Sequence, residues 1–317
     1  MRSIIQNRNL LALVLMAPLF LHGQEEIAHS ARIDLRNGLP FVRILINGRG
    51  PFSFVFDTAT TGRAIVSQVV ASELGLKTEG KATLNDLQGG SEKQLDAVKL
   101  ASLSVAGVEI DGVKAMVKTL PGSARHYDGI VGLGLFRDYL VTLDFPHRQI
   151  QLKKGALSME KNRNVLSCQS DVGVPTILLR FQGHEVEGTI DTGAQGLIIP
   201  ESLAKDLSLL GLPESIGLDE TLVERFQVQR ARMAGSIELA TFRFDRPHLW
   251  ISPGVRTTIL GMETFRDFSL TIDQRNQLVQ FWSQKAKHVI GHSPMNKDLR
   301  IPADNIEKAV MRTGAPY

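Results

Sequence analysis

Two stretches of the chain share one uncommon pattern, a run of apolar β-forming residues that ends on an aspartate. Residues 54–60 read FVFDTAT and residues 188–194 read GTIDTGA, and a second apolar run follows each of them. A carboxylate at the end of a buried strand is costly unless it is paired or hydrogen-bonded. Two acids in equivalent settings therefore predict that Asp57 and Asp191 meet in the folded chain. Facing carboxylates split their pKa values and can act together as an acid and a base.

A second pair of matching segments follows in the same order. Residues 130–138 read IVGLGLFRD and residues 259–267 read ILGMETFRD, and each leads into a short run that ends on Asp144 or Asp273. The two aspartate motifs are 134 residues apart and the two glycine segments are 129 residues apart, so the order is kept with small gaps. A chain of 317 residues also suits two domains better than one. We therefore expect one β-rich unit that occurs twice.

The residues around these motifs predict strands and two short helices. Residues 40–48 alternate apolar and polar side chains before a turn, and residues 174–183 repeat this pattern. The helix expected at 67–76 begins at a capping serine and ends near a glycine. The helix expected at 201–207 follows a proline, which a first helical turn tolerates. The polar, charged stretch 153–167 has no apolar period and is the expected linker.

The repeated motifs are similar to those of the aspartic peptidases, in particular to retropepsin-like units fused in tandem. The similarity covers most of the chain, residues 31–284. It implies a mainly β fold in which two similar β-barrel lobes are related by a pseudo-twofold axis, the acid protease fold. The lobes are expected at 31–152 and 168–284, with the linker 153–167 between them and a C-terminal tail at 285–317.

The resemblance also implies a role for each motif residue. Asp57 and Asp191 are the expected catalytic pair, which holds a water between the carboxylates, removes its proton and protonates the scissile carbonyl. Which of the two carries the proton is left open. Thr58 and Thr192 are expected to hydrogen-bond across the halves. The supporting positions are Thr58, Ala59, Thr60, Gly132, Thr192, Gly193, Ala194 and Gly261. Both halves lie on one chain, so we expect a monomer that acts on an extended peptide or protein with no cofactor and no metal.

The residue that follows each motif bears on the working pH. In the family a hydroxyl at this place can donate a hydrogen bond to the neighbouring aspartate. Thr60 supplies a hydroxyl in the first half, whereas Ala194 cannot do so in the second. A hydrogen bond of this kind favours the charged carboxylate. With only one such donor, the resemblance implies a mildly acidic rather than a strongly acidic optimum.

Two features depart from the family pattern. Residue 59 is alanine where the family almost always has glycine, a residue that keeps side-chain atoms away from an approaching substrate. The glycine pair of the expected flap, Gly89-Gly90, occurs only in the first half, because the matching stretch 221–234 contains no glycine. The retained aspartates and threonines favour an exported aspartic endopeptidase. Ala59 favours the alternative, a catalytically impaired retropepsin-like module that binds peptides, and cleavage of its own chain alone is a third possibility.

The beginning of the chain is typical of a secretory signal. Within residues 1–23, Arg2 and Arg8 give a positive start, residues 10–21 form an apolar run, and a histidine-glycine pair offers a cleavage site. The alternative is a membrane anchor, but a spanning helix needs roughly 20 apolar residues. We therefore expect an exported protein, periplasmic or secreted, with no membrane span once the signal is removed.

Composition and motifs argue against several other classes of protein. The net charge is +3, of which the two signal arginines supply two, so the rest of the chain has no basic field for nucleic acid. Cys168 is the only cysteine, which excludes an intramolecular disulfide and is most simply a structural thiol. The histidines show no zinc-binding spacing, and no Gly-x-Ser-x-Gly elbow occurs. The segment that begins at Gly132 lacks the third glycine of a dinucleotide-binding loop.

Overall fold

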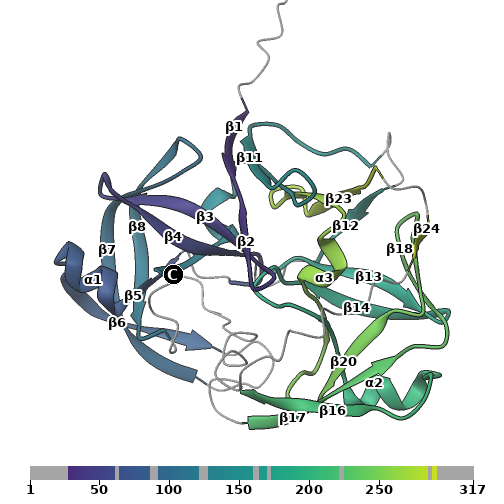
Figure 1. Ribbon diagram of the computed structural model, residues 1–317. Helices are drawn as coiled ribbons and strands as arrows, with labels where there is room; N and C mark the ends of the chain where they lie inside the picture. Colours follow the sequence, from purple (N-terminus) through teal and green to yellow (C-terminus); the bar gives the residue numbers. More distant parts are fainter. Residues whose placement is uncertain are drawn as a thin grey trace, which may run out of the picture.

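A computed structural model describes residues 28–60, 64–85, 92–120, 128–159, 164–169, 173–220, 225–284 and 288–290. The protein is mainly β and consists of two similar β-rich lobes that lie side by side (Figure 1). The prediction of a mainly β fold built from a duplicated unit is thereby confirmed. The predicted signal at 1–23 lies outside the described residues, as does the predicted tail at 285–317 apart from 288–290.

The N-terminal lobe is built on an eight-stranded sheet with the strand order β2-β3-β4-β9-β5-β8-β7-β6. Its strands are β2 (Asp34–Arg36), β3 (Leu39–Ile46), β4 (Arg49–Asp57), β5 (Ala64–Ser67), β6 (Thr78–Asn85), β7 (Glu92–Val105), β8 (Val108–Lys118) and β9 (Gly129–Gly132). The long strand β7 also pairs with β3, where Ile44 lies opposite Val105. This extra pairing curls the sheet towards a barrel and removes part of its exposed edge.

The C-terminal lobe is built on a ten-stranded sheet with the order β16-β17-β20-β15-β21-β14-β13-β18-β19-β24. Its strands are β13 (Thr176–Phe181), β14 (His184–Ile190), β15 (Leu197–Pro200), β16 (Glu214–Glu220), β17 (Arg225–Arg232), β18 (Ser236–Leu239), β19 (Phe242–Asp245), β20 (His248–Ser252), β21 (Thr258–Leu260) and β24 (His288–Ile290). The pairings of the first lobe recur here. β14 runs parallel to β21 as β4 does to β9, and β15 runs parallel to β20 as β5 does to β8.

The described residues also form four short helices: α1 (Gln68–Leu74), the 3-10 helix η1 (Leu133–Phe136), α2 (Glu201–Asp206) and α3 (Met262–Phe265). The hydroxyl of Ser67 caps α1 by accepting a hydrogen bond from the Val70 amide, and Gly75 ends the helix at a φ of 63°. Both residues were predicted in these roles, since a serine cap and a left-handed glycine are the common ends of a helix. α2 follows Pro200 as expected.

A third sheet joins the two lobes. It has the order β1-β11-β10-β22-β23-β12 and contains β1 (His29–Arg32), β10 (Leu140–Asp144), β11 (Gln149–Lys153), β12 (Val165–Ser167), β22 (Ser269–Asp273) and β23 (Leu278–Trp282). At its centre Thr142 lies opposite Thr271, and their hydroxyl oxygens are 2.9 Å apart. These two threonines are 129 residues apart, the spacing of the glycine segments, so the pseudo-twofold axis passes between them.

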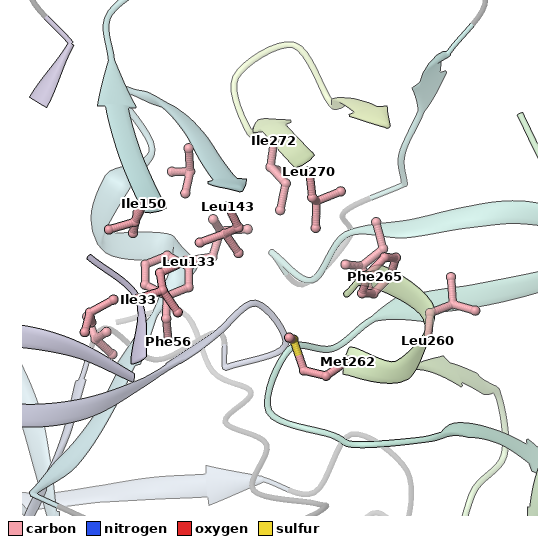
Figure 2. Packing of buried hydrophobic residues seen from close by; sticks show 14 of the residues in the cluster. Ile33, Phe56, Leu133, Leu143, Ile150, Leu260, Met262, Phe265, Leu270 and Ile272 are labelled. Carbon is pink, nitrogen blue, oxygen red and sulfur yellow. The ribbon is translucent and has the colours of Figure 1, made fainter. Parts of the chain in front are cut away.

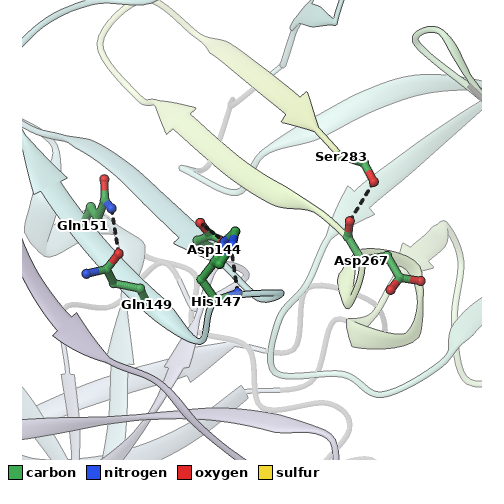
Figure 3. Close-up of polar contacts among 6 residues, drawn as sticks. All are labelled: Asp144, His147, Gln149, Gln151, Asp267 and Ser283. Atoms are coloured by element: carbon green, nitrogen blue, oxygen red, sulfur yellow. Dashed lines mark hydrogen bonds and ion pairs between the residues drawn. The ribbon is translucent and has the colours of Figure 1, made fainter. Parts of the chain in front are cut away.

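The turns of this joining sheet repeat the same local chemistry. Asp144 Oδ1 accepts a hydrogen bond from the His147 amide at 3.2 Å, and Asp273 Oδ1 accepts one from the Asn276 amide at 3.1 Å. In the first turn the imidazole Nδ1 of His147 also lies 2.9 Å from the Asp144 carboxylate (Figure 3). An aspartate side chain that accepts a hydrogen bond from a nearby backbone amide is a common feature of turns.

The apolar core continues from one lobe into the other beneath this sheet. Figure 2 shows buried residues of both lobes converging there, with Phe56, Leu133 and Leu143 on one side and Leu260, Met262 and Phe265 on the other. Phe56 stacks on Phe136, with ring centroids 5.7 Å apart. Because the lobes share this core, we expect them to unfold together.

The predicted linker overlaps regular structure at both ends. Residue 153 is the last of β11, and β12 occupies 165–167 and pairs with β23. Between these strands, the Leu157 amide donates a hydrogen bond to Asp273 Oδ2 of β22 at 2.9 Å. The joining sheet therefore draws strands from both halves of the chain.

Candidate active site

The two aspartate motifs lie at corresponding ends of paired strands. Asp57 is the last residue of β4 and lies beside Gly132 of β9, while Asp191 directly follows β14, and its amide donates a hydrogen bond to the Leu260 carbonyl of β21. Their exposed fractions are 4% and 3%. Carboxylic acids this deeply buried need hydrogen-bonding partners, so the groups around them define the chemistry of the site.

The two loops are joined by four hydrogen bonds between the lobes. Thr58 Oγ1 donates to the Ile190 carbonyl at 2.7 Å and accepts from the Thr192 amide at 3.0 Å. In the mirrored pair, Thr192 Oγ1 donates to the Phe56 carbonyl at 2.7 Å and accepts from the Thr58 amide at 3.1 Å. Both hydroxyls are fully buried, and each satisfies one donor and one acceptor of the opposite loop. The loops therefore hold each other in position.

Asp57 accepts hydrogen bonds from three groups of its own loop. Its Oδ1 accepts from the Ala59 amide at 2.8 Å and from the Thr60 amide at 3.1 Å, and its Oδ2 accepts from the Thr60 hydroxyl at 2.6 Å. Hydrogen bonds donated to a carboxylate favour its charged form. The loop therefore supplies hydrogen-bond donors to both oxygens of the buried Asp57 carboxyl group.

Asp191 lies in a similar loop, but the residue that corresponds to Thr60 has no hydroxyl group. Its Oδ1 accepts from the Gly193 amide at 2.9 Å, as Asp57 does from Ala59. The counterpart of Thr60 is Ala194, which has no hydroxyl and is fully buried. The two carboxyl groups are therefore placed alike but are not hydrogen-bonded alike.

Gly193 shows how close the two carboxyl groups are. A Cβ built on this glycine would lie 2.8 Å from Asp57 Oδ2 and 3.2 Å from Asp191 Oδ1. Both acids thus face the same small space, in which a side chain would clash with them. Two carboxyl groups that face one such space are suited to share a proton and to activate a water.

The glycine segment of the C-terminal lobe lies directly behind its aspartate loop. A Cβ on Gly261 would come within 2.8 Å of the Gln195 carbonyl carbon and 2.9 Å of the Ala194 carbonyl oxygen. Three successive amides, of residues 261–263, donate to the carbonyls of residues 194–196. Only glycine allows this approach, which fixes the loop from behind.

Ala59, the departure from the family pattern, is accommodated without strain. Its exposed fraction is 0%, and its amide donates a hydrogen bond to Asp57. Its φ is not positive, so the backbone does not require a glycine at this position. The predicted flap residues Gly89 and Gly90 lie outside the described residues, although the strands on either side of them, β6 and β7, form a hairpin. The C-terminal lobe has the corresponding hairpin of β16 and β17.

Two contacts beside Asp191 were not predicted from the sequence. Gln195 Nε2 donates to the Asn37 carbonyl of the other lobe at 2.6 Å. Trp250 of β20 packs on Gly196, where a Cβ would lie 2.8 Å from the indole ring. Both contacts join residues that are far apart in the chain. The one feature of the sequence that could have indicated them is the position of Gln195 and Gly196 directly after the second aspartate motif.

The described part of the chain contains no group of three or more histidine, cysteine or acidic side chains that could hold a metal ion. Within the same residues, no helix is long and apolar enough to cross a membrane.

Comparison with known proteins gives one finding. The family model described as aspartyl protease matches the chain twice, over residues 42–135 and 177–264, which together make up more than half of it. The two matches contain the two aspartate motifs and the glycines Gly132 and Gly261 of the two glycine segments. No curated protein matches the chain.

Proposed function

The chain belongs to the aspartyl protease family, and on this premise we propose that it is an exported aspartic endopeptidase in which Asp57 and Asp191 are the catalytic residues. The observation that carries the proposal is the arrangement around Gly193, where two buried carboxyl groups, one from each lobe, face one small space. The four hydrogen bonds of Thr58 and Thr192 hold this arrangement without a second chain, which supports a monomer.

In the proposed reaction a water lies between the two carboxyl groups. The ionised carboxylate takes a proton from this water while the protonated carboxyl donates its proton to the carbonyl oxygen of the substrate. The water oxygen attacks the carbonyl carbon, and the resulting tetrahedral intermediate breaks its bond to nitrogen as that nitrogen takes up a proton. Each carboxyl group therefore acts in both halves of the reaction, and neither a cofactor nor a metal is required.

The second candidate function, a module that binds peptides without cutting them, has one specific observation in its favour. Residue 59 carries a methyl group where the corresponding Gly193 carries none, and a methyl on Gly193 would lie 2.8 Å from the opposite carboxylate. Against this reading, the loop of Ala59 keeps its hydrogen bonds to Asp57. We therefore place the peptidase first.

Digestion of a mixed peptide library across pH tests the proposal, with the Asp191→Asn variant as the matched control. This substitution keeps the size of the side chain and removes its acid chemistry. New peptide ends that form with the natural protein and not with the variant support the peptidase. Binding of peptides with no cleavage at any pH supports the binding module instead.

The proposed location is the periplasm or the outside of the cell. The basis is the signal-like composition of residues 1–23, and we propose that this segment is removed. In the remaining chain we propose that residues 31–152 and 168–284 act as the two lobes and that residues 285–317 are a tail. Fractionation of cells that express the full chain, with sequencing of the mature N-terminus, tests the export and the cleavage site. An intact N-terminus on cytoplasmic protein would contradict them.

A further inference from the structure

One face of the C-terminal sheet lies directly beside the Asp191 loop. Its apolar residues form a cluster separate from the main core: Ala194, Ile198, Val228, Trp250, Val255 and Ile259. Ala194 belongs to the Asp191 loop, and Trp250 packs on Gly196 of the same loop. The opposite face of the same strands, with Ile199 and Ile251, packs into the main core. The first face is therefore the one that borders the Asp191 loop through Ala194 and Trp250.

Strand register places a charged residue on this face. Arg230 of β17 lies directly opposite Trp250 of β20, and Glu214 of β16 lies directly opposite Arg230. Directly opposite residues of neighbouring antiparallel strands point to the same side of a sheet. The guanidinium of Arg230 is 3.3 Å from the Glu214 carboxylate, so the two charges meet on the side of the Asp191 loop.

A second acid approaches the same place from behind the loop. Glu263 is the second residue of α3, and its amide donates to the Gln195 carbonyl at 2.7 Å. Burial raises the pKa of Glu263, while the nearby Arg266 and Arg230 act to lower it. Arg230 therefore lies near two carboxyl groups, one exposed and one largely buried.

The N-terminal lobe has none of these charges at the corresponding positions. Met116 takes the place of Trp250, since it lies beside Ile65 of β5 as Trp250 lies beside Ile198 of β15. Opposite Met116 is Ala97, and opposite Ala97 is Gly80, so these two correspond to Arg230 and Glu214. In the glycine segments, Glu263 corresponds to Gly134. Three charged residues of one lobe thus match three small uncharged residues of the other.

We infer that Arg230 is a specificity-determining residue. It selects a substrate side chain that ends in a carboxylate, on the part of the peptide that lies against the C-terminal lobe. The part of the peptide against the N-terminal lobe is apolar. The inference rests on the proposed function in that it places a peptide across both lobes. The N-terminal lobe offers the apolar cluster that contains Ile65, Met116 and Ile130.

The balance of charge favours an acidic over a basic side chain. Arg230 has Arg232 on its own strand and Arg266 next to α3, and among the described side chains the acids placed near Arg230 are Glu214 and Glu263. The Glu214 side chain is 74% exposed, so its ion pair with Arg230 is weak. A substrate carboxylate can replace it and gain a charge-assisted, paired contact with the guanidinium, a geometry for which arginine is suited.

Cleavage of a peptide library by the natural protein and by the Arg230→Ala variant is the first test, because this change gives the C-terminal lobe the residue of the N-terminal lobe. One position on one side of the cut bond is expected to prefer aspartate and glutamate over leucine by about tenfold, the effect of one hydrogen bond to a charged group. Arg230→Ala, and Arg230→Gln as a variant closer in size, should abolish the preference. Arg243→Ala is the matched control, since Arg243 also pairs with two acids but lies on β19, away from the Asp191 loop.

Binding to the Asp191→Asn variant is the second test and does not require cleavage. Peptides that differ only by glutamate, glutamine or lysine at the selected position are compared, with and without Arg230→Ala. Tighter binding of the glutamate peptide that is lost with Arg230→Ala supports the inference even if the natural protein cuts nothing, in which case only the proposed peptidase fails. A preference for lysine, an acidic preference that survives Arg230→Ala, or no binding of any peptide would overturn the inference.

Discussion

The hydroxyl of Thr60 donates a 2.6 Å hydrogen bond to Asp57 Oδ2, and the other lobe cannot repeat it, because the residue after its motif is Ala194. The two copies of the unit thus place their acids alike, but only the first copy has a hydroxyl that donates to its acid. Since hydrogen bonds to a carboxylate favour its charged form, the two acids stand in unequal surroundings.

Substitution of either acid should abolish proteolysis. Asp57→Asn and Asp191→Asn each remove one of two groups that act in both proton transfers, so each alone is expected to lower kcat by several orders of magnitude. The double variant should be scarcely worse than either single one, because the residues act as a unit. Initial rates of the three variants measure this. Substantial turnover by either single variant would show that the water is not shared.

The buried threonines should contribute strongly to stability. Thr58→Val and Thr192→Val each leave an amide and a carbonyl of the opposite loop without a partner, at about 1–3 kcal/mol for each buried group. We expect the free energy of unfolding to fall by about 2–6 kcal/mol for each variant, and by less than the sum for the double variant.

Urea denaturation of the four proteins in this cycle provides the measurement. Thr142→Val is the matched control, because it breaks a threonine pair on the same pseudo-twofold axis that is only partly buried. Equal losses for Thr142→Val and Thr58→Val would contradict the special role of the loop threonines.

Much of the fold around the two acids could be predicted from the sequence, because it depends on residues that are close together in the chain. The strand that ends on Asp57 follows from apolar residues before an acid, and α1 follows from a serine cap and a terminal glycine. The repeat adds information that single segments lack, since a motif that recurs in the same order predicts the same fold twice. The family match over both halves confirms that reading.

The features that were missed depend on contacts between distant segments. β12 lies in the charged stretch that reads as a linker, and becomes a strand because β23 offers it an edge. Arg230 reads as one of several charges in a polar run, and only the register with Trp250 places it on the side of Asp191. Strand register follows from tertiary pairing, which one-dimensional patterns specify weakly.

The space between the acids should not tolerate a methyl group at residue 193. Gly193→Ala places a Cβ 2.8 Å from the Asp57 carboxylate and 3.2 Å from Asp191, so one acid must move. Small displacements of catalytic groups are costly, and we expect kcat/KM to fall about a hundredfold. Ala59→Gly is the matched control, which removes a methyl at the corresponding position and should keep activity. A large gain with Ala59→Gly would instead show that the natural methyl group impairs catalysis.

Cys168 should make the protein less stable in alkali. Burial, together with the nearby Asp273, raises the pKa of this thiol to about 11 from 9.0. Above pH 9 the unfolded chain loses the thiol proton while the folded chain keeps it, so stability falls between pH 9 and 11, by about 1–3 kcal/mol. Cys168→Ala should flatten this part of the profile of unfolding free energy against pH. An unchanged slope would show that other groups cause it.

The pH profile of catalysis should respond to hydroxyls at residues 60 and 194 in opposite ways. Thr60→Ala removes a donor to Asp57, which disfavours its charged form and should move the acidic limb of kcat/KM to higher pH. Ala194→Ser offers a donor to Asp191 and should move that limb to lower pH. A hydrogen bond to a charged group corresponds to about one pH unit in each case. Because the two acids titrate as a coupled pair, the limb reports the pair and not one residue. The measurement is the pH profile of kcat/KM for the natural protein and both variants with one substrate. Acidic limbs that stay in place in both variants would show that the hydroxyls at residues 60 and 194 do not set the titration of the pair.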